Sequence, residues 1–169
     1  PLLNPLFIAL SRLFLPVSST VYSPFLNLDL LMKKVALFGA GRIGRIHAAN
    51  LAAMPGIELV AVSDPMADSA AELAQLHGAR VDSIDHIFAD PSIDTVVIGS
   101  PTTTHTDLIT RAAQAGKSIF CEKPVDLSAE RARACAAVVA QAGVACMIGF
   151  QRRFDPTFNE ARTRMDRGD

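Results

Sequence analysis

Residues 33–44 read KKVALFGAGRIG, an apolar run followed by a glycine-rich turn. The apolar run predicts a strand, and apolar residues at helical spacing over residues 43–54 predict a helix directly after it. Gly39, Gly41 and Gly44 therefore form a GxGxxG motif between a strand and a helix, the context in which this motif holds a dinucleotide. The first glycine allows a tight turn, the second lets the backbone approach a pyrophosphate, and the third lets the helix pack closely on the strand.

An acidic residue stands at the end of the second expected strand. Residues 57–63, IELVAVS, predict a strand that ends at Asp64, twenty residues after Gly44. A carboxylate at this place can accept hydrogen bonds from the hydroxyls of an adenosine ribose, and its charge disfavours the 2′-phosphate of NADP. The motif and the carboxylate together predict NAD as the cofactor. The alternative interpretation is a tight turn made by the glycines and a helix cap made by Asp64.

Strand-like and helix-like stretches alternate along most of the chain. Further strands are expected at residues 94–99, 118–121 and 144–148, and further helices at residues 67–76, 104–115 and 129–142. Ser128 can cap the last of these helices, and Gly143 can end it. Alternating elements with near-continuous apolar strands require a parallel sheet covered by helices on both faces. The sequence therefore predicts an α/β fold with a doubly wound parallel sheet, the NAD-binding Rossmann fold.

The composition changes near residue 31 and again after residue 150. Residues 1–31 contain two charged residues and several prolines without a regular period, so we expect a non-native or disordered leader with the true start at Met32. Arg12 and the prolines interrupt the apolar run that a transmembrane helix needs, and a signal peptide would need a basic start. Residues 32–150 are the expected dinucleotide-binding domain. Residues 151–169 are expected to begin a truncated second, α+β substrate domain.

The charge balance and the cysteines argue against several classes of partner. With 16 basic and 17 acidic residues the formal net charge is −1, so the chain lacks the basic surplus that nucleic-acid binding requires. Cys121, Cys135 and Cys146 are widely spaced without a CxxC pattern, which argues against a disulfide framework and a zinc site. We therefore expect no nucleic-acid, membrane or metal partner, and a reducing, cytoplasmic compartment.

Two polar segments follow later strands. Residues 99–105, GSPTTTH, lie where the fourth strand of such a sheet ends, and their small and hydroxylated side chains suit contact with the ribose and nicotinamide of a dinucleotide. His105 either contacts the cofactor or fixes the loop at the start of a helix, and the sequence leaves both interpretations open. Residues 121–124, CEKP, place a charged pair at the carboxyl end of a strand, with a surface ion pair as the alternative.

These segments, together with GFQRRFDP at residues 149–156, resemble the family that includes glucose–fructose oxidoreductase and inositol dehydrogenase. The resemblance covers residues 32–169 and is strongest to inositol 2-dehydrogenases. It implies that cofactor contacts come from Gly39, Gly41, Arg42, Ile43, Gly44, Asp64, Ser100, Pro101, Thr102, His105, Glu122 and Lys123. It implies that Lys123 is catalytic, that Lys123, Gln151 and Arg152 lie near the substrate, and that Pro124 is preceded by a cis peptide bond. The family's Asp-x-x-x-His pair has no counterpart before Asp169.

The resemblance also implies an activity. A protein of this kind oxidises a secondary alcohol of a cyclitol with NAD, converting myo-inositol to 2-keto-myo-inositol, and the full-length protein is expected to be a homo-oligomer. Such a reaction needs a group that takes the hydroxyl proton, and a neutral lysine can serve. These 169 residues alone are expected to be inactive. The alternatives are another sugar dehydrogenase of the same family and a dinucleotide-binding module without turnover.

Overall fold

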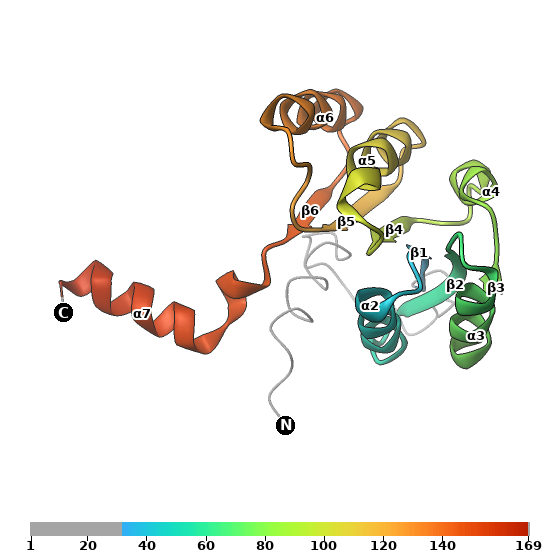
Figure 1. Cartoon of the computed structure of the whole chain (residues 1–169), viewed down its shortest axis with the longest axis horizontal. Coiled ribbons are helices and arrows are strands. Elements are labelled where there is room, and N and C mark those ends of the chain that lie inside the picture. Colours follow the sequence, from blue (N-terminus) through green and yellow to red (C-terminus); the bar gives the residue numbers. More distant parts are fainter. Residues whose placement is uncertain (1–31, 169) are drawn as a thin grey trace, which may run out of the picture.

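The computed structural model describes residues 32–168, which form a six-stranded parallel sheet (Figure 1). The strands are β1 (Lys33–Phe38), β2 (Ile57–Ser63), β3 (Arg80–Val81), β4 (Thr95–Ile98), β5 (Ser118–Glu122) and β6 (Cys146–Gly149). Their order is β3-β2-β1-β4-β5-β6, and every neighbouring pair is parallel. The strand order reverses between β1 and β4, so the predicted doubly wound sheet is confirmed. The prediction for residues 1–31 falls outside the described residues.

Helices cover both faces of this sheet. They are α2 (Arg42–Ala52), α3 (Ala67–His77), α4 (Ile84–Ala89), α5 (His105–Gln114) and α6 (Ala129–Ala142), and a further helix, α7 (Pro156–Arg167), does not pack on the sheet. Helices α2 and α3 pack on one face, whereas α4, α5 and α6 pack on the other (Figure 1). The predicted ends of α6 are confirmed, because Ser128 Oγ accepts a hydrogen bond from the Arg131 amide and Gly143 adopts the left-handed conformation.

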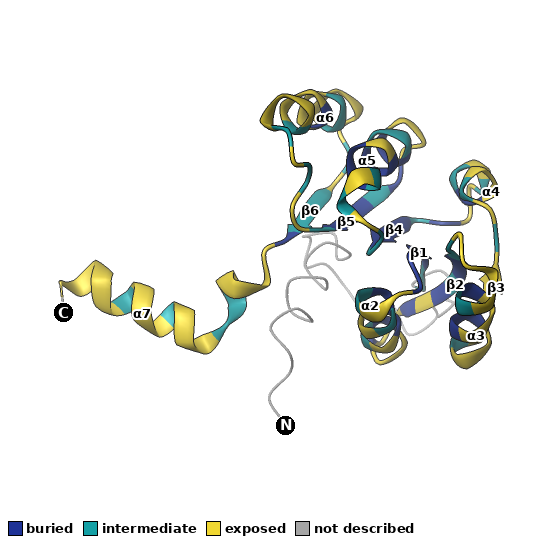
Figure 2. Ribbon diagram, in the orientation of Figure 1, coloured by how far each residue is buried: buried dark blue, intermediate teal, exposed yellow. Residues whose placement is uncertain are grey.

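The core is divided between the two faces of the central strand. Along β1, Val35 and Leu37 belong to the cluster under α2 and α3, whereas Ala36 and Phe38 belong to the cluster under α5. This alternation is the period of two that a strand imposes, and both sets are apolar because both faces are covered. Figure 2 shows the result as buried strands beneath helices whose outer sides are exposed.

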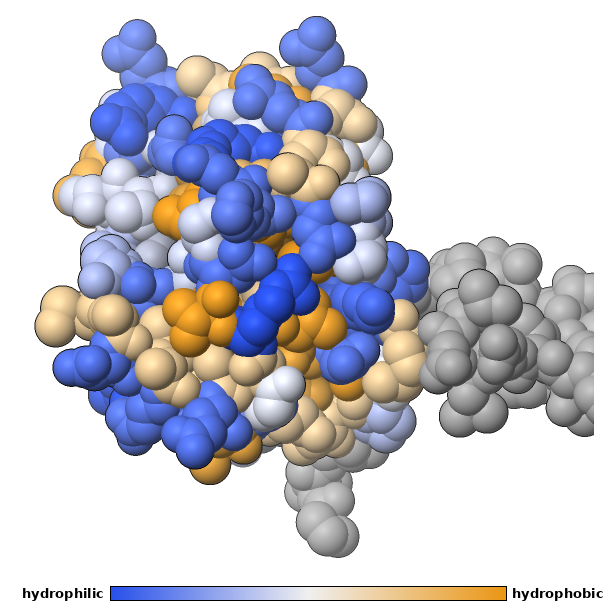
Figure 3. Space-filling model, turned by 90° about the vertical axis from the view of Figure 1, so that its right-hand side faces the viewer, coloured by the Kyte–Doolittle hydropathy of each residue, from blue (hydrophilic) through white to orange (hydrophobic). Residues whose placement is uncertain are grey.

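One edge of the sheet was not expected from the sequence. Strand β3 has only two residues, both exposed, and α4 follows it with six. Figure 3 shows the molecule from this side, with hydrophilic side chains around a smaller hydrophobic area. A two-residue strand presents few free backbone groups, so this edge offers little for another strand to pair with. The segment lacks a long apolar run, which is why the sequence pattern did not reveal it.

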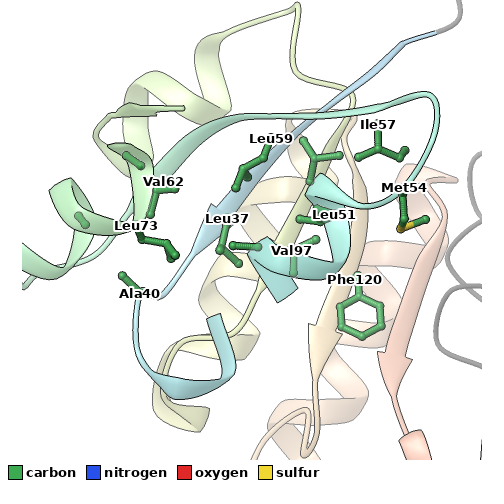
Figure 4. Close-up of a cluster of buried hydrophobic side chains, with 14 residues drawn as sticks. Leu37, Ala40, Leu51, Met54, Ile57, Leu59, Val62, Leu73, Val97 and Phe120 are labelled. Atoms are coloured by element: carbon green, nitrogen blue, oxygen red, sulfur yellow. The ribbon is translucent and has the colours of Figure 1, made fainter. Parts of the chain in front are cut away.

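The cluster on the α2 side reaches the turn where the sheet meets its first helix. Leu37 of β1, Val97 of β4 and Phe120 of β5 come from three adjacent strands and face Leu51 of α2 (Figure 4). All four residues are buried. This packing fixes α2 against the sheet and thereby fixes the glycine-rich turn before it.

Helix α7 differs from the other long helices. It contains no buried residue and extends away from the sheet (Figure 2). It follows the short 3-10 helix Gln151–Phe154 that comes after β6. Across residues 32–168, no helix has both the length and the apolar character needed to cross a membrane.

Candidate active site

Three glycines meet where the strand order reverses. A Cβ atom on Gly44 would lie 1.9 Å from the carbonyl oxygen of Gly39, and one on Gly39 would lie 2.8 Å from the carbonyl group of Gly99. Gly39 also has a φ of +101°, which side chains other than that of glycine rarely allow. The glycines thus let β1, α2 and the end of β4 approach one another more closely than any side chain would permit.

The start of α2 presents free backbone N–H groups. Gly41 is the N-cap, no side chain caps the helix, and no acidic residue occupies its first turn. The first amides of a helix have no partner within the helix, and its dipole attracts an anion to them. A Cβ atom on Gly41 would meet nothing within 4 Å, so a ligand can approach the backbone here. These features fit a pyrophosphate.

Asp64 stands beside this turn at the end of β2. Its Oδ2 accepts a hydrogen bond from the Ala40 amide at 2.7 Å, and its Oδ1 accepts one from the Met66 amide at 2.8 Å. The carboxylate therefore braces the glycine-rich turn and the segment before α3. The alternative drawn from the sequence had Asp64 capping the next helix, but α3 begins at N-cap Met66 without a side-chain cap. Each oxygen still has a second lone pair that can accept from a ribose hydroxyl, so bracing of the turn and binding of a ribose are compatible.

The turn after β4 is folded by its own hydroxyl groups. Thr104 Oγ1 donates to the carbonyl oxygen of Pro101 at 2.8 Å and lies 2.6 Å from Ser100 Oγ. The hydroxyl hydrogen of Thr104 points to the carbonyl oxygen of Pro101. The hydroxyl of Ser100 is therefore the donor in its hydrogen bond to Thr104 Oγ1. Some hydroxyls of the segment GSPTTTH thus hold the turn together, and Thr102 lines the adjoining cavity.

A cavity of about 500 Å³ lies between the start of α2 and the ends of β4 and β5. This volume is in the usual range for small-molecule sites. The predicted site residues that line it are Arg42, Ile43, Ser100, Pro101, Thr102, His105, Glu122, Lys123 and Gln151. The fold therefore brings together four segments that are far apart in the sequence.

Glu122, the last residue of β5, and Lys123, which follows it, form one part of this cavity. Lys123 is exposed, and the peptide bond between Lys123 and Pro124 is cis. Burial acts to raise the pKa of Glu122, but hydrogen bonds from His47 and from the Lys123 amide, with the charges of those residues, lower it below its ordinary value. Glu122 is therefore an ionised carboxylate beside an exposed lysine.

His105 is buried and faces two carbonyl groups. Its Nδ1 lies 2.7 Å from the oxygen of Pro124, and its Nε2 lies 2.9 Å from the oxygen of Ser100. Both ring nitrogens are thus engaged by the loops that follow β5 and β4. This arrangement favours the interpretation in which His105 fixes loops, while its contact with a cofactor stays a prediction.

Arg152 lies apart from the other predicted site residues. Its guanidinium carbon is 4.6 Å from the centroid of the Phe158 ring, and it lines a separate hollow with residues of α7. The role of Arg152 toward a substrate therefore stays a prediction that this arrangement does not support directly.

Two functional candidates were missed by the sequence analysis. Asp126 braces the loop after Pro124, because its carboxylate accepts hydrogen bonds from the Thr106 hydroxyl at 2.9 Å and from the Ser128 amide at 2.8 Å. His47 is buried in α2, with Nε2 2.9 Å from Oε1 of Glu122. One signal was present for His47: it lies three residues after Gly44, on the helix face that packs against the sheet.

The cysteines are free thiols. Burial raises the pKa of Cys146 to about 11 and also raises the pKa of Cys121 and Cys135 above the ordinary value. Thiols of this kind are weak nucleophiles at neutral pH. In the part of the chain that the structure describes, no three His, Cys, Asp or Glu side chains are grouped in a way that could hold a metal ion.

The doubly wound sheet, the glycine-rich helix start and the cavity at the reversal point define a dinucleotide-binding protein. Residues 33–150 match the oxidoreductase family with an NAD-binding Rossmann fold that contains glucose–fructose oxidoreductase, inositol dehydrogenase and MocA. The chain belongs to this family, as the resemblance in its sequence indicated.

Known members of the family are similar to this chain over its described part. It is 50% identical over 135 residues to inositol 2-dehydrogenase from Rhizobium meliloti (strain 1021) and 44% identical over 139 residues to scyllo-inositol 2-dehydrogenase (NAD(+)) from Bacillus subtilis (strain 168). Each match covers 80% of this chain and 41% of the relative. The chain thus spans less than half the length of the relatives that it matches.

A solved structure with a similar fold contains a dinucleotide and a cyclitol. Scyllo-inositol dehydrogenase from Lactobacillus casei, with bound NAD(H) and scyllo-inositol, matches with a TM-score of 0.75 and 31% identity. The match covers 81% of this chain and 42% of that structure. NAD is thus the cofactor of the family and of a structural neighbour.

Proposed function

We propose that this protein oxidises a ring secondary alcohol of a cyclitol with NAD, and that myo-inositol is the substrate and 2-keto-myo-inositol the product. The main support is the position of Lys123, exposed at the end of β5 on the wall of the cavity that the start of α2 also lines. The inositol dehydrogenases among its relatives support the substrate class.

In the proposed cofactor site, each part of the dinucleotide lies at the end of a different strand of the sheet. The start of α2 holds the pyrophosphate through Gly39, Gly41, Arg42, Ile43 and Gly44. Asp64 accepts from the adenosine ribose, because it stands beside the same turn. Ser100, Pro101, Thr102, Glu122 and Lys123 line the cavity at the nicotinamide end.

The chemistry assigned to the chain's residues is a proton transfer. NAD supplies the hydride acceptor when it is bound. The substrate hydroxyl must lose its proton as its carbon loses hydride, so a base has to lie within hydrogen-bond reach of that oxygen. Lys123 Nζ, in its neutral form, takes this proton and becomes an ammonium group. Gln151 lines the same cavity and can hydrogen-bond another hydroxyl of the ring.

We also propose that a domain boundary lies near residue 150. The buried core residues all precede this position, and α7 has no buried residue. Residues 32–150 would then be the dinucleotide-binding domain, and residues 151–169 the beginning of a substrate domain.

A chimaera tests whether residues 32–150 can supply the cofactor site and Lys123 to a cyclitol dehydrogenase. Residues 32–150 would replace the matching segment of the 50% identical Rhizobium meliloti relative, which supplies the remainder of a known inositol 2-dehydrogenase. NADH formation would be followed at 340 nm with myo-inositol, scyllo-inositol and glucose. We expect kcat/KM to be highest for myo-inositol. A chimaera that binds NAD but turns over only glucose, or no polyol at all, would contradict the proposal.

A further inference from the structure

Gly39, Gly44 and Gly99, where β1, α2 and the end of β4 approach one another, are called the glycine crossing below. The side chain of His47 lies between this crossing and the cavity. It is 3% exposed, and its Cδ2 is 3.7 Å from the place that a Cβ atom on Gly99 would occupy. Its ring packs edge-on against Phe120, with the centroids 5.1 Å apart and the planes at 65°. Phe120 of β5 therefore packs against the ring of this α2 residue, and the missing side chain of Gly99, after β4, leaves room for it.

The ring is aimed at a carboxylate that lines the cavity. Nε2 of His47 lies 2.9 Å from Oε1 of Glu122, and the Lys123 amide donates to Oε2 of Glu122 at 3.3 Å. An ionised carboxylate can only accept hydrogen bonds, so Nε2 of His47 must donate. Both oxygens of Glu122 are thus held, one by α2 and one by the backbone of Lys123.

The other side of this carboxylate is shaped by a glycine. A Cβ atom on Gly149 would lie 3.4 Å from Oε1 of Glu122 and 3.0 Å from Cζ of Phe120. Glu122 and Gly149 are also paired in the register between β5 and β6. The carboxylate therefore fits into a space bounded by His47 and by a strand residue without a side chain.

From these contacts we infer that His47 is a positioning residue, which holds the carboxylate of Glu122 at the nicotinamide end of the cavity. The inference rests on the proposed function for its account of the ligand, but the contact between His47 and Glu122 exists without any ligand. Only 21% of the Glu122 side chain is exposed, so loss of the His47 donor would leave a largely buried charge with one hydrogen bond fewer. The carboxylate would then move toward solvent or take up a proton.

A matched pair of variants separates the donor from the space that it fills. The amide nitrogen of His47→Gln can reach about the position of Nε2, whereas that of His47→Asn is one methylene shorter. Both variants are neutral and polar. We expect His47→Gln to retain the bond to Glu122 and His47→Asn to lose it.

The first readout needs no cofactor. The backbone amide of Lys123 donates to Glu122, so its resonance in a ¹⁵N–¹H spectrum of the 169-residue protein reports where the carboxylate lies. This resonance should shift in His47→Asn and stay near its original position in His47→Gln. An unchanged resonance in His47→Asn, or equal shifts in both variants, would overturn the inference.

The second readout is binding, measured by calorimetry with oxidised NAD and with ADP, which lacks the nicotinamide and its ribose. We expect His47→Asn to weaken NAD binding about 10- to 150-fold, the range for one hydrogen bond to a charged group. Binding of ADP should change less than about 2-fold, and His47→Gln should bind both ligands like the wild type. Equal weakening of NAD and ADP by His47→Asn would mean general damage and would overturn the inference.

Two further results complete the test. In a Glu122→Gln background, His47→Asn should add little to the loss of NAD binding, because both changes act on one contact. If His47→Asn fails to fold, the same double-mutant comparison is made with His47→Gln and Glu122→Gln. A loss of NAD affinity in His47→Gln that persists in the Glu122→Gln background then counts against the inference. If the wild type binds no NAD while the Lys123 amide still separates the variants, the proposed function fails and the positioning by His47 stands.

Discussion

Strand β5 is flanked by two lysines whose environments are opposite. Lys117 precedes the strand and is 3% exposed, and its Nζ donates to the carbonyl oxygens of Asp90 at 2.7 Å and Ile93 at 3.0 Å. Lys123 follows the strand and is exposed on the cavity wall. The donors of the first lysine are used within the fold, while those of the second remain available to a ligand.

The two ends of the sheet differ in the same way as these lysines. At the amino end, Lys117 and Asp94 tie the segment before β4 to its neighbours, with Asp94 accepting from Lys33 and from the Lys34 amide. At the carboxyl end, the segments after β1, β4 and β5 leave a cavity between them. In open parallel sheets ligands bind at the carboxyl ends of the strands, so the amino end is free to serve stability.

Replacing Lys123 is expected to have the largest effect on the reaction. In the chimaera described above, Lys123→Ala should lower kcat by about 10²- to 10⁴-fold, because the group that takes the hydroxyl proton is lost. Its melting temperature should hardly change, since an exposed side chain contributes little to stability. Steady-state kinetics and thermal unfolding followed by circular dichroism would measure both. Retention of wild-type kcat would remove Lys123 from the reaction.

The next largest effect is expected at the glycine crossing. Gly44→Ala puts a Cβ atom 1.9 Å from a backbone oxygen and should cost about 3 kcal/mol or more of unfolding free energy. Gly41→Ala is the control, because its Cβ meets nothing within 4 Å, and it should fold normally yet bind NAD less tightly. Urea unfolding and calorimetry distinguish these outcomes. Equal stabilities of the two variants would show that the backbone at Gly39 and Gly44 can move apart to accommodate the added methyl group.

Lys117→Met should affect stability but not binding. It leaves two carbonyl oxygens without their donor, and we expect a loss of about 1–3 kcal/mol of unfolding free energy. Lys33→Met is the matched control at the same end of the sheet, where a partly exposed ion pair should be worth less than about 1 kcal/mol. If Lys117→Met instead weakened NAD binding in the folded protein, the functional separation of the two ends would be wrong.

A smaller effect is expected from Asp64, which is predicted to discriminate between dinucleotides. Its carboxylate would face the 2′-phosphate of NADP, so NAD should bind about tenfold more tightly, and Asp64→Asn should reduce this ratio. Asp64→Asn also shows how much Asp64 contributes to the fold, because its carboxylate accepts the hydrogen bond from the Ala40 amide. Titration of both cofactors gives the ratio, and equal or tighter NADP binding by the wild type contradicts the prediction.

The smallest effect is a pH dependence at the amino end of the sheet. Burial lowers the pKa of Lys117 below its ordinary value of 10.5, against the opposing charges of Asp90 and Asp94. Between the folded and the unfolded pKa the unfolded chain binds more protons, so the stability contributed by this group rises with pH through that window. Urea unfolding from pH 8 to 10.5 should therefore show the free energy of the wild type rising relative to that of Lys117→Met. A difference that falls with pH would contradict this sign.

Local patterns in the sequence were enough to predict the class of fold and the kind of cofactor. The alternation of apolar strands and amphipathic helices, the spacing of Gly39, Gly41 and Gly44, and the position of Asp64 all lie within short stretches of chain. Strand and helix periods are local properties, so they can be identified without knowing which elements meet. Within residues 33–149 the main strands and helices were accordingly predicted to within a few residues, whereas the short β3 and α4 were not.

The tertiary structure alone decided which side chains meet. The contact between His47 and Glu122 joins residues 75 positions apart, and the contact between Lys117 and Asp90 joins residues 27 apart. The sequence singled out Lys123 through the segment CEKP, but nothing in the residues around Lys117 indicated that this lysine is buried. Burial and hydrogen-bond partners depend on how the strands are ordered in the sheet, and that order is set by the packing of the whole domain rather than by any local period.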